Sequence, residues 1–596
     1  MPAKPRVVVV GAGMAGLSAA HRLHQTCKHA FDLTVLEGSD HIGGRIHSAN
    51  LGGDQIELGA TFIHGTKGSP IYQIAENIGA LSSETPWEKK DAKWANRVFR
   101  AQGLSLPVDP QVVYPAMNFY WSSMNLVKTP DVSTSSLAKG SVGAFLRQRL
   151  ESFMMDEATS DDDEALRAQQ MTSMSREECE ARQSQGMGNG NEHVGKNDPF
   201  NIPETEEGKM HSDTNEGVLW SSRLLQESLF RSLEAKECSI SACHTLDDLD
   251  LLSLKEYTEY PGPHITIGKG YVSVLKELEK SLPPTTIKFR KKVQKVFWNH
   301  SHASAFAPVV LECEDGSIVE AEHAILTVSL GVLKAGTMKR EPGGTSICRS
   351  VQDLRAWKDK APTDELFQPS LPPWKLGAIH RLGFGLVNKM FILLDPSADK
   401  DLLANIVFLH HRDFGKAVAL PSWLRRAFSM YPVYKCSNVL LCWLAGNEAL
   451  EMEGLTDEEV LDGVAEMLVE FRFGTKEKGG SLKQRVRCML KAVRRSKWAT
   501  NLLCQGSYSF VAVGSTGLDI EDLAKPLPDG DGDGDGDGNG GSILLGQGDG
   551  DGESLVGPPS TRGLRFTHGE PSMQLVFAGE ATDRSFYSTA HGAFRS

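Results

Sequence analysis

The apolar residues near the N-terminus follow the order strand, turn, helix, strand. Residues 6–10 form a short run rich in β-branched residues, which predicts a buried strand. A glycine-rich turn follows directly, and the alanine-rich residues 17–23 predict a helix. Residues 31–37 contain another apolar run and predict a second strand. A parallel βαβ unit has this order, so the sequence predicts an α/β fold.

Further apolar runs predict regular elements along the rest of the chain. Residues 220–233 predict a helix, and residues 265–275 predict a turn followed by a helix. Residues 457–471 have the spacing of an amphipathic helix. Short runs rich in β-forming residues predict strands over 286–298, 308–313, 323–328, 386–394, 439–444 and 574–577.

Two long segments lack such a pattern. Residues 151–216 are rich in Asp, Glu, Gln, Ser and Met, which predicts a mobile insertion. Residues 529–552 repeat Asp-Gly, and their aspartate spacing is similar to that of a calcium-binding loop. The bidentate glutamate of such a loop would fall on Gly540, Ser542 or Leu544. A disordered acidic loop is therefore the better interpretation.

Length and composition limit the number of domains and exclude several kinds of partner. The 596 residues allow about two to four domains, and the net charge of −13 argues against a nucleic-acid partner. No run approaches about 18 apolar residues, so we expect no membrane partner. The ten cysteines are scattered without a Cys-x-x-Cys pair, which predicts no disulfide scaffold and no metal site. The N-terminus lacks a secretory pattern, so we expect a cytoplasmic protein.

The turn after the first strand has the composition of a dinucleotide-binding site. Gly11 permits a tight turn, Gly13 lets the backbone approach a pyrophosphate, and Gly16 allows close helix–strand packing. The N-terminus of the following helix offers unpaired N–H groups to the phosphates. Glu37 ends the second strand about 20 residues after Gly16, where a carboxylate accepts hydrogen bonds from ribose hydroxyls.

A second glycine pair, Gly43 and Gly44, is followed by Arg45. This pair supplies another close backbone approach, and the arginine supplies a fixed cation for a pyrophosphate. An NAD enzyme does not need these features because its cofactor must leave after each turnover. We therefore expect a tightly held FAD.

The chain resembles the flavin-containing amine oxidases in several separate segments. Within that family it is most similar to polyamine oxidases of the spermine/thermospermine oxidase-like, back-conversion group. His64 and Thr589 fit this group, whereas terminal-type polyamine oxidases are expected to have Glu and Tyr there. The resemblance lies in residues 7–65, 327–334, 386–389, 497–498, 506–509, 577–582 and 587–593.

This resemblance implies a Rossmann-like FAD-binding domain interleaved with an α+β substrate-binding domain. The FAD-binding domain would comprise residues 1–85, 263–335 and 491–596. The substrate-binding domain would comprise residues 86–262 and 336–490.

The resemblance also assigns residues to the cofactor. Glu37 and Arg45 would hold the ribose and pyrophosphate, and Val293 would meet the adenine through its backbone. Glu580 would lie by the ribityl-pyrophosphate region, and Ala590 would offer its N–H to the pyrimidine edge of the flavin. The remaining expected cofactor contacts are Gly11, Gly13, Gly16, Gly44, Gly59, Ala60, Thr61, Trp498, Gly579 and Thr589.

Lys389 is the main catalytic candidate, because a lysine at this position in the family binds a water that meets flavin N5. His64 would contact a substrate amine, although a structural role for this histidine is an equal alternative. Tyr508 would form one wall of the substrate site, and Thr589 would leave the opposite side wider or more polar. Ser507 stands where monoamine oxidases have Cys, so the FAD should be non-covalent.

The resemblance implies oxidation of a small polyamine with O₂, giving spermidine, 3-aminopropanal and H₂O₂, by a monomeric enzyme. Spaced carboxylates would bind the ammonium groups; Glu256, Glu259 and the pair Asp247 and Asp248 are candidates. Two alternatives stay open. One is an amine oxidase that acts on methylated lysine. The other is a flavin-binding protein without turnover, because relatives continue into a helix beyond the position of Ser596.

Overall fold

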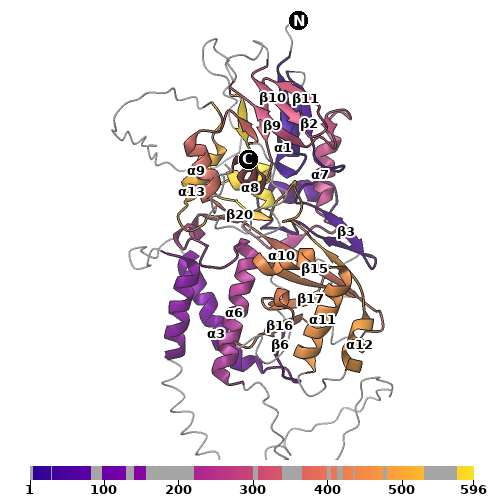
Figure 1. The fold of residues 1–596 in the computed structure, drawn as a ribbon, viewed down its shortest axis with the longest axis vertical. Helices are drawn as coiled ribbons and strands as arrows, with labels where there is room; N and C mark the ends of the chain where they lie inside the picture. Colours follow the sequence, from indigo (N-terminus) through magenta and orange to yellow (C-terminus); the bar gives the residue numbers. More distant parts are fainter. Residues whose placement is uncertain are drawn as a thin grey trace, which may run out of the picture.

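The computed structural model describes most of the chain in twelve segments (Figure 1). The predicted insertion lies outside the described residues from 156 onward, and the predicted acidic loop lies outside them entirely. Residues 151–155 end a helix that begins at 142. The described segments are 4–27, 30–81, 97–128, 140–155, 220–299, 307–338, 365–398, 405–412, 420–433, 437–473, 480–528 and 573–596.

A five-stranded parallel sheet forms the upper body of the molecule in Figure 1. Its central strand is β1 (Arg6–Val10), in which the four valines are at most 5% exposed because both faces of the sheet are covered. The helix α1 (Met14–Thr26) connects β1 to β2 (Asp32–Leu36), so the predicted βαβ order and α/β class are confirmed. The other strands are β12 (His323–Leu326), which lies beside β1, and the two edge strands β8 (Ile287–Lys288) and β21 (Leu575–Phe577).

The strand predicted over residues 286–298 is two strands that belong to different sheets. The first is β8 of the parallel sheet, and the second is β9 (Val293–Phe297) of a four-stranded sheet. The chain turns between them at Arg290, whose φ of 58° breaks the extended backbone. The other strands of this sheet are β10 (Val309–Cys313), β11 (Ile318–Ala321) and β13 (Phe367–Gln368).

A six-stranded sheet forms the lower body in Figure 1. Its longest strand is β15 (Val387–Leu394), which pairs with β18 (Val439–Ala445) from Val387 to Leu393. The strand predictions over 386–394 and 439–444 are therefore confirmed. The remaining strands are β6 (Arg97–Ala101), β16 (Asn405–Leu409), β17 (Ser429–Pro432) and β19 (Leu490–Arg495).

Alternate residues of this lower sheet pack against different groups of helices, as the period of two of a strand requires. Ile406 and Phe408 face a core shared with α10 (Gly446–Gly454), α11 (Asp457–Arg472) and α12 (Gly480–Met489). Val407 and Leu409 face a second core, which contains α3 (Pro110–Lys128) and α6 (Ser222–Ser241).

The remaining elements join the two bodies or cover their faces. Among the described residues, no helix is long and apolar enough to cross a bilayer. The strands are β3 (Ser48–Leu51), β4 (Asp54–Glu57), β5 (Phe62–Ile63), β7 (Ile265–Thr266), β14 (Gly383–Gly385) and β20 (Tyr508–Phe510). The helices are α2 (Pro70–Asn77), α7 (Val272–Lys280), α8 (Leu330–Thr337), α9 (Pro373–Arg381), α13 (Gly517–Ala524) and α14 (Ala590–Arg595), with short 3₁₀ turns at Leu252–Glu256, Ser422–Leu424 and Glu580–Thr582.

Candidate active site

A cavity of about 1200 Å³ runs from the glycine-rich turn after β1 to the face of the lower sheet that carries Lys389. Apart from the carboxylate candidates, every predicted site residue except Gly16 lines it. Gly16 supports the turn instead, since a Cβ at this position would lie 1.9 Å from the carbonyl oxygen of Gly11. The predicted residues in the lining are Gly11, Gly13, Glu37, Gly44, Arg45, Gly59, Ala60, Thr61, His64, Val293, Lys389, Trp498, Tyr508, Gly579, Glu580, Thr589 and Ala590.

The buried carboxylate of Glu37 closes the turn at one end of the cavity. Its Oε2 accepts a hydrogen bond from the backbone N–H of Ala12 at 2.7 Å, and its Oε1 accepts one from Ser39 at 2.8 Å. Each oxygen has a second lone pair, so Glu37 can still accept from a ribose hydroxyl. The left-handed φ of 109° at Gly11 explains the glycine at this turn.

Three glycines leave space that no neighbouring protein atom fills. A Cβ built on Gly13 or Gly44 would have no described atom nearer than 3.7 Å, and one on Gly579 would meet none within 4 Å. All three glycines line the cavity, where the N-terminus of α1 also lies. This cradle and the nearby helix terminus fit the pyrophosphate of a dinucleotide. The cavity volume leaves room for the rest of FAD and for a substrate.

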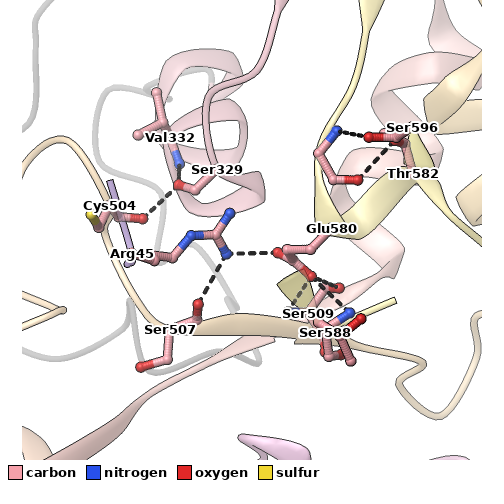
Figure 2. A network of polar contacts seen from close by, with 12 residues as sticks. Arg45, Ser329, Val332, Cys504, Ser507, Ser509, Glu580, Thr582, Ser588 and Ser596 are labelled. Carbon is pink, nitrogen blue, oxygen red and sulfur yellow. Dashed lines mark hydrogen bonds and ion pairs between the residues drawn. The ribbon is translucent and has the colours of Figure 1, made fainter. Parts of the chain in front are cut away.

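An ion pair joins the two ends of the chain beside this cradle (Figure 2). Nη1 of Arg45 lies 2.7 Å from Oε1 of Glu580, and it also donates to the carbonyl oxygen of Ser507 at 2.9 Å. The other oxygen of Glu580 accepts from the hydroxyl of Ser509 at 2.6 Å and from the N–H of Ser588 at 3.0 Å. The Arg45 side chain is 24% exposed, so part of it faces the cavity.

Lys389 extends from β15 into the cavity wall and is only 3% exposed. Its ammonium donates to the carbonyl oxygen of Glu57 at 2.7 Å, to the carbonyl oxygen of Gly59 and to the hydroxyl of Thr61. It also lies 4.6 Å from the ring centre of Trp443. These contacts satisfy a buried ammonium and fix the segment that carries Gly59, Ala60 and Thr61.

Glu57 is a half-buried acid that sequence analysis did not identify. Its carboxylate accepts from the N–H of Tyr271 at 2.9 Å and from the hydroxyl of Ser48 at 2.8 Å. Burial raises the pKa of Glu57 above its ordinary value, although the ammonium of Lys389 opposes the shift. The short strand β4 gave no signal for this role, because two of its neighbours, Tyr271 and Lys389, lie 214 and 332 positions away in sequence.

The hydroxyl of Ser507 is fully engaged with the backbone of β15. It donates to the carbonyl oxygen of Val387 at 2.8 Å and accepts from the N–H of the same residue at 2.8 Å. The neighbouring Tyr508 lines the cavity, and its hydroxyl donates to the carbonyl oxygen of Ser239. Burial raises the pKa of Tyr508, so this phenol stays protonated. Trp498 also lines the cavity and is 9% exposed.

Thr589 and Ala590 begin α14 at the cavity wall. The hydroxyl of Thr589 accepts from the N–H of Gly592 at 3.1 Å and donates to the carbonyl oxygen of Phe586 at 2.7 Å. The threonine therefore caps the helix, and its contact with a substrate stays a prediction. As the first residue of α14, Ala590 has an N–H without a partner inside the helix, which suits the expected flavin contact.

Among the proposed carboxylates, Glu259 lines the cavity, whereas Glu256, Asp247 and Asp248 do not. Glu256 pairs with Arg584 at 3.0 Å, and Asp247 pairs with an arginine on the surface. Asp248 accepts from the N–H of Thr245. Glu237 lines the cavity as well, and sequence analysis missed it because it lies within an ordinary helical segment.

His64 lies beside Glu259, with its Nδ1 3.7 Å from Oε1 of that residue. The same nitrogen is 3.1 Å from Nδ1 of His264, which sequence analysis did not identify. The predicted amine-binding histidine is thus part of a cluster of two imidazoles and one carboxylate at the cavity wall.

Comparison with known proteins matches residues 14–596 to the family of flavin-containing amine oxidoreductases. The chain is 34% identical to probable polyamine oxidase 5 of Arabidopsis thaliana, over 100% of this chain and 97% of the relative. It is 32% identical to polyamine oxidase 1 of Oryza sativa subsp. japonica, covering 100% and 95%. It is 30% identical to the human peroxisomal N(1)-acetyl-spermine/spermidine oxidase, covering 100% and 94%.

The matched region includes Lys389 and the whole cavity wall from Met14 onward. A flavin-containing family also agrees with the glycine cradle and with Glu37 at the nucleotide end of the cavity. The resemblance seen in the sequence is therefore confirmed. The chain belongs to the flavin-containing amine oxidoreductase family and is an amine oxidase with FAD as its cofactor.

Proposed function

We propose that the protein oxidises spermine- or thermospermine-type polyamines at a secondary amine. The resulting iminium takes up water and releases spermidine and 3-aminopropanal, while O₂ is reduced to H₂O₂. FAD, when bound, supplies the redox chemistry by accepting a hydride from the carbon beside an amine and passing the electrons to O₂. The names of the relatives support a polyamine substrate. The choice among individual polyamines is our inference.

The observation that carries the proposal is the continuity of one cavity. The cradle at Gly13 and the ammonium of Lys389 line the same space as Glu237 and Glu259. A polyamine is a chain of ammonium groups separated by methylenes, so it needs carboxylates that are spaced along an apolar passage. The cavity provides that combination, since its apolar lining includes Phe99, Leu229, Leu233, Val407, Phe428, Tyr431, Trp443 and Phe510.

The chain's own residues would orient the substrate and exclude water. His64 and Glu259 can hold one amine by hydrogen bonding, and Tyr508 forms a wall whose hydroxyl is already bonded to the backbone. Lys389 fixes the backbone from Glu57 to Thr61 and presents its ammonium at the cavity surface. The rate enhancement would come from holding the reacting C–H in one orientation.

The test is anaerobic mixing of the FAD-loaded protein with a panel of amines while the 450 nm absorbance of the flavin is followed. Spermine, thermospermine, N1-acetylspermine and spermidine should be compared, with the products identified by mass spectrometry. Rapid bleaching by spermine or thermospermine with formation of 3-aminopropanal is the expected result. Bleaching only by acetylated forms would replace the proposed substrate with an acetylated polyamine.

The same panel tests the two alternatives when a dimethyl-lysine peptide is added. Bleaching by this peptide alone would indicate a demethylase. A flavin that is bound yet stays oxidised with every amine would indicate a protein without turnover. Each result contradicts the proposed polyamine oxidation.

A further inference from the structure

The pairing of two short strands brings His64 and His264 together. In the antiparallel pair β5–β7, Phe62 lies opposite Thr266 and Ile63 lies opposite Ile265. One further step along the same register places His64 opposite His264. Their Nδ1 atoms are 3.1 Å apart, although the residues are 200 positions apart in sequence.

The loop before β7 brings a carboxylate to the same point. Pro261 accepts hydrogen bonds from the N–H groups of Thr66 and Lys67 at 3.0 and 2.8 Å, which holds the loop against the segment after His64. The approach is so close that a Cβ on Gly65 would lie 1.7 Å from the carbonyl oxygen of Tyr260. The tyrosine ring stacks on a phenylalanine at 4.8 Å, so the loop is fixed on both sides.

Glu259 therefore faces both imidazoles. Its Oε2 lies 3.2 Å from Nε2 of His264, and its Oε1 lies 3.7 Å from Nδ1 of His64. The hydroxyl of Tyr257 donates to Oε1 at 3.4 Å and helps to orient the carboxylate. One ligand atom from each of the three residues can be chosen so that all lie within 4.8 Å of one another.

We propose that His64, Glu259 and His264 form a binding site for a divalent transition-metal ion, with Zn²⁺ as the best match. Two imidazoles and one carboxylate are a set that zinc accepts, and three protein ligands leave a fourth position for water or an amine. Ligand atoms of a tetrahedral zinc site lie about 3.3 Å apart, given bonds of about 2.0–2.1 Å. With one nitrogen taken from each imidazole, the three ligand atoms of this cluster lie within 4.8 Å of one another, so small side-chain rotations would bring them to that spacing.

The expectation of no metal site rested on the spacing of the cysteines and on the Asp-Gly repeat, neither of which involves these residues. The ligands of this cluster come from two segments that only the β5–β7 pairing brings together. Their side chains are 16% to 34% exposed, so an ion can reach them without unfolding the loop.

A bound dication would also oppose the binding of a polycationic substrate, because His64 and Glu259 line the cavity. Zinc would then raise the apparent KM for a polyamine and leave the maximal rate unchanged. This consequence rests on the proposed function, whereas metal binding itself does not.

The test is equilibrium dialysis of the FAD-loaded protein, freed of metal with EDTA, against ZnCl₂. We expect one Zn²⁺ per chain and an affinity at least about tenfold lower in Glu259→Gln and His264→Ala. His24→Ala removes an imidazole from the last turn of α1, outside the cluster, and should bind zinc as the unchanged protein does. Retained FAD absorbance and circular dichroism will show that each variant is folded.

Zinc binding that is absent from the unchanged protein, or equally tight in Glu259→Gln and His264→Ala, would overturn the site. Steady-state kinetics with a reactive amine then test separately whether bound zinc competes with the substrate. Competitive inhibition by zinc that disappears in Glu259→Gln would support this competition. Stoichiometric zinc binding without any change in KM would support the metal site and contradict the proposed inhibition by zinc. A failure of polyamine oxidation would leave the dialysis result intact.

Discussion

The guanidinium of Arg45 donates to the carboxylate of Glu580 across 2.7 Å, although 535 positions separate the two residues in sequence. Glu580 is 6% exposed in its side chain and depends on this partner, because its other neighbours are neutral hydroxyl and N–H donors. Both residues line the cofactor end of the cavity. The pair therefore holds the N-terminal and C-terminal segments together at the place where they form the FAD site.

Replacing Arg45 with Gln should lower both stability and FAD content. The substitution leaves the buried carboxylate of Glu580 without its cation, which costs about 2–4 kcal/mol. We expect a lower ratio of 450 nm to 280 nm absorbance after purification and a lower urea midpoint. Arg147→Gln is a matched control, since it breaks an ion pair whose side chains are 56% and 49% exposed. Equal effects of the two substitutions would contradict the role of the buried pair.

Lys389→Met should slow reduction of the flavin by about 100-fold while FAD stays bound. The substitution removes the donor that fixes the segment from Glu57 to Thr61 against the cavity. The cofactor cradle at the other end of the cavity is unchanged. Stopped-flow measurement of flavin reduction under anaerobic conditions gives the rate, and the absorbance spectrum gives the FAD content.

Lys375→Met separates this effect from a general loss of stability. Lys375 is fully buried, and its ammonium also donates to backbone carbonyl oxygens, those of Asp522 and Leu523. It does not line the cavity. Both substitutions leave buried carbonyl groups without a donor and should lower stability by similar amounts. Slow flavin reduction in both variants would mean that Lys389 acts only through stability.

The local sequence pattern was sufficient to predict the residues at the nucleotide-binding end of the site. The turn at Gly11 and the acid at Glu37 belong to one contiguous βαβ unit, so their spacing carries the geometry. The local pattern Gly43-Gly44-Arg45 also indicated Arg45, whereas resemblance to a family added Lys389, which no local pattern identifies as buried. The domain boundaries stay a prediction, although the parallel sheet combines strands from the beginning, middle and end of the chain.

The other parts of the fold and of the site depend on contacts between segments that are far apart in sequence. Strand β6 contains two arginines and shows no clean alternation, yet Phe99 and Ala101 fill the core beneath α3 and α6. Glu57 and His264 had no signal because Tyr271 and His64, the contacts that reveal their roles, lie 214 and 200 positions away. Such pairings are set by strand register in the folded chain and have no periodicity that a sequence reveals.

FAD should separate from the protein when the protein is denatured. Ser507 cannot form the thioether of a covalent flavin, and its hydroxyl is bonded twice to Val387. Precipitation with trichloroacetic acid should give a colourless pellet and a yellow supernatant whose flavin has the mass of intact FAD. A yellow pellet that survives washing would contradict this prediction.

The protein should lose stability as the pH falls from about 6.5 toward 4, partly because of His591. Burial lowers the pKa of His591 to about 4, and its Nε2 lies 2.8 Å from the hydroxyl of Ser69. Between these pH values the unfolded chain binds a proton that the folded state does not, so acid favours unfolding. The full shift corresponds to about 3 kcal/mol.

His591→Gln should reduce this acid sensitivity, since Gln can keep a hydrogen bond to Ser69 and does not titrate. Urea unfolding of the FAD-saturated proteins at several pH values from 4 to 8 gives the comparison. Burial also lowers the pKa of His410 to about 4, so part of the acid sensitivity should remain in the variant. A pH profile identical to that of the unchanged protein would exclude a contribution from His591.

One wall of the cavity carries positive charge, which should affect the choice among polyamines. Lys236 of α6 lies 4.5 Å from the ring centre of Trp121, and both residues line the cavity. Arg97 and Lys128 line the cavity as well. Burial lowers the pKa of Arg97 to about 9, as expected for a cation in an apolar wall. A terminal ammonium placed beside these groups is repelled, whereas a neutral acetyl end is not.

Lys236→Met should therefore raise kcat/KM for spermine by about 2–5-fold relative to kcat/KM for N1-acetylspermine. Methionine keeps the unbranched stem on Trp121 and removes only the charge. Because both kcat/KM values are measured on the same preparation, their ratio is not affected by a change in the fraction of active enzyme. At high salt the ratio should approach that of the unchanged protein, because ions screen the repulsion. Lys280→Met is the control, since its side chain is 79% exposed and does not line the cavity. An unchanged ratio in Lys236→Met would show that the terminal amine of the substrate, free or acetylated, does not bind at this wall.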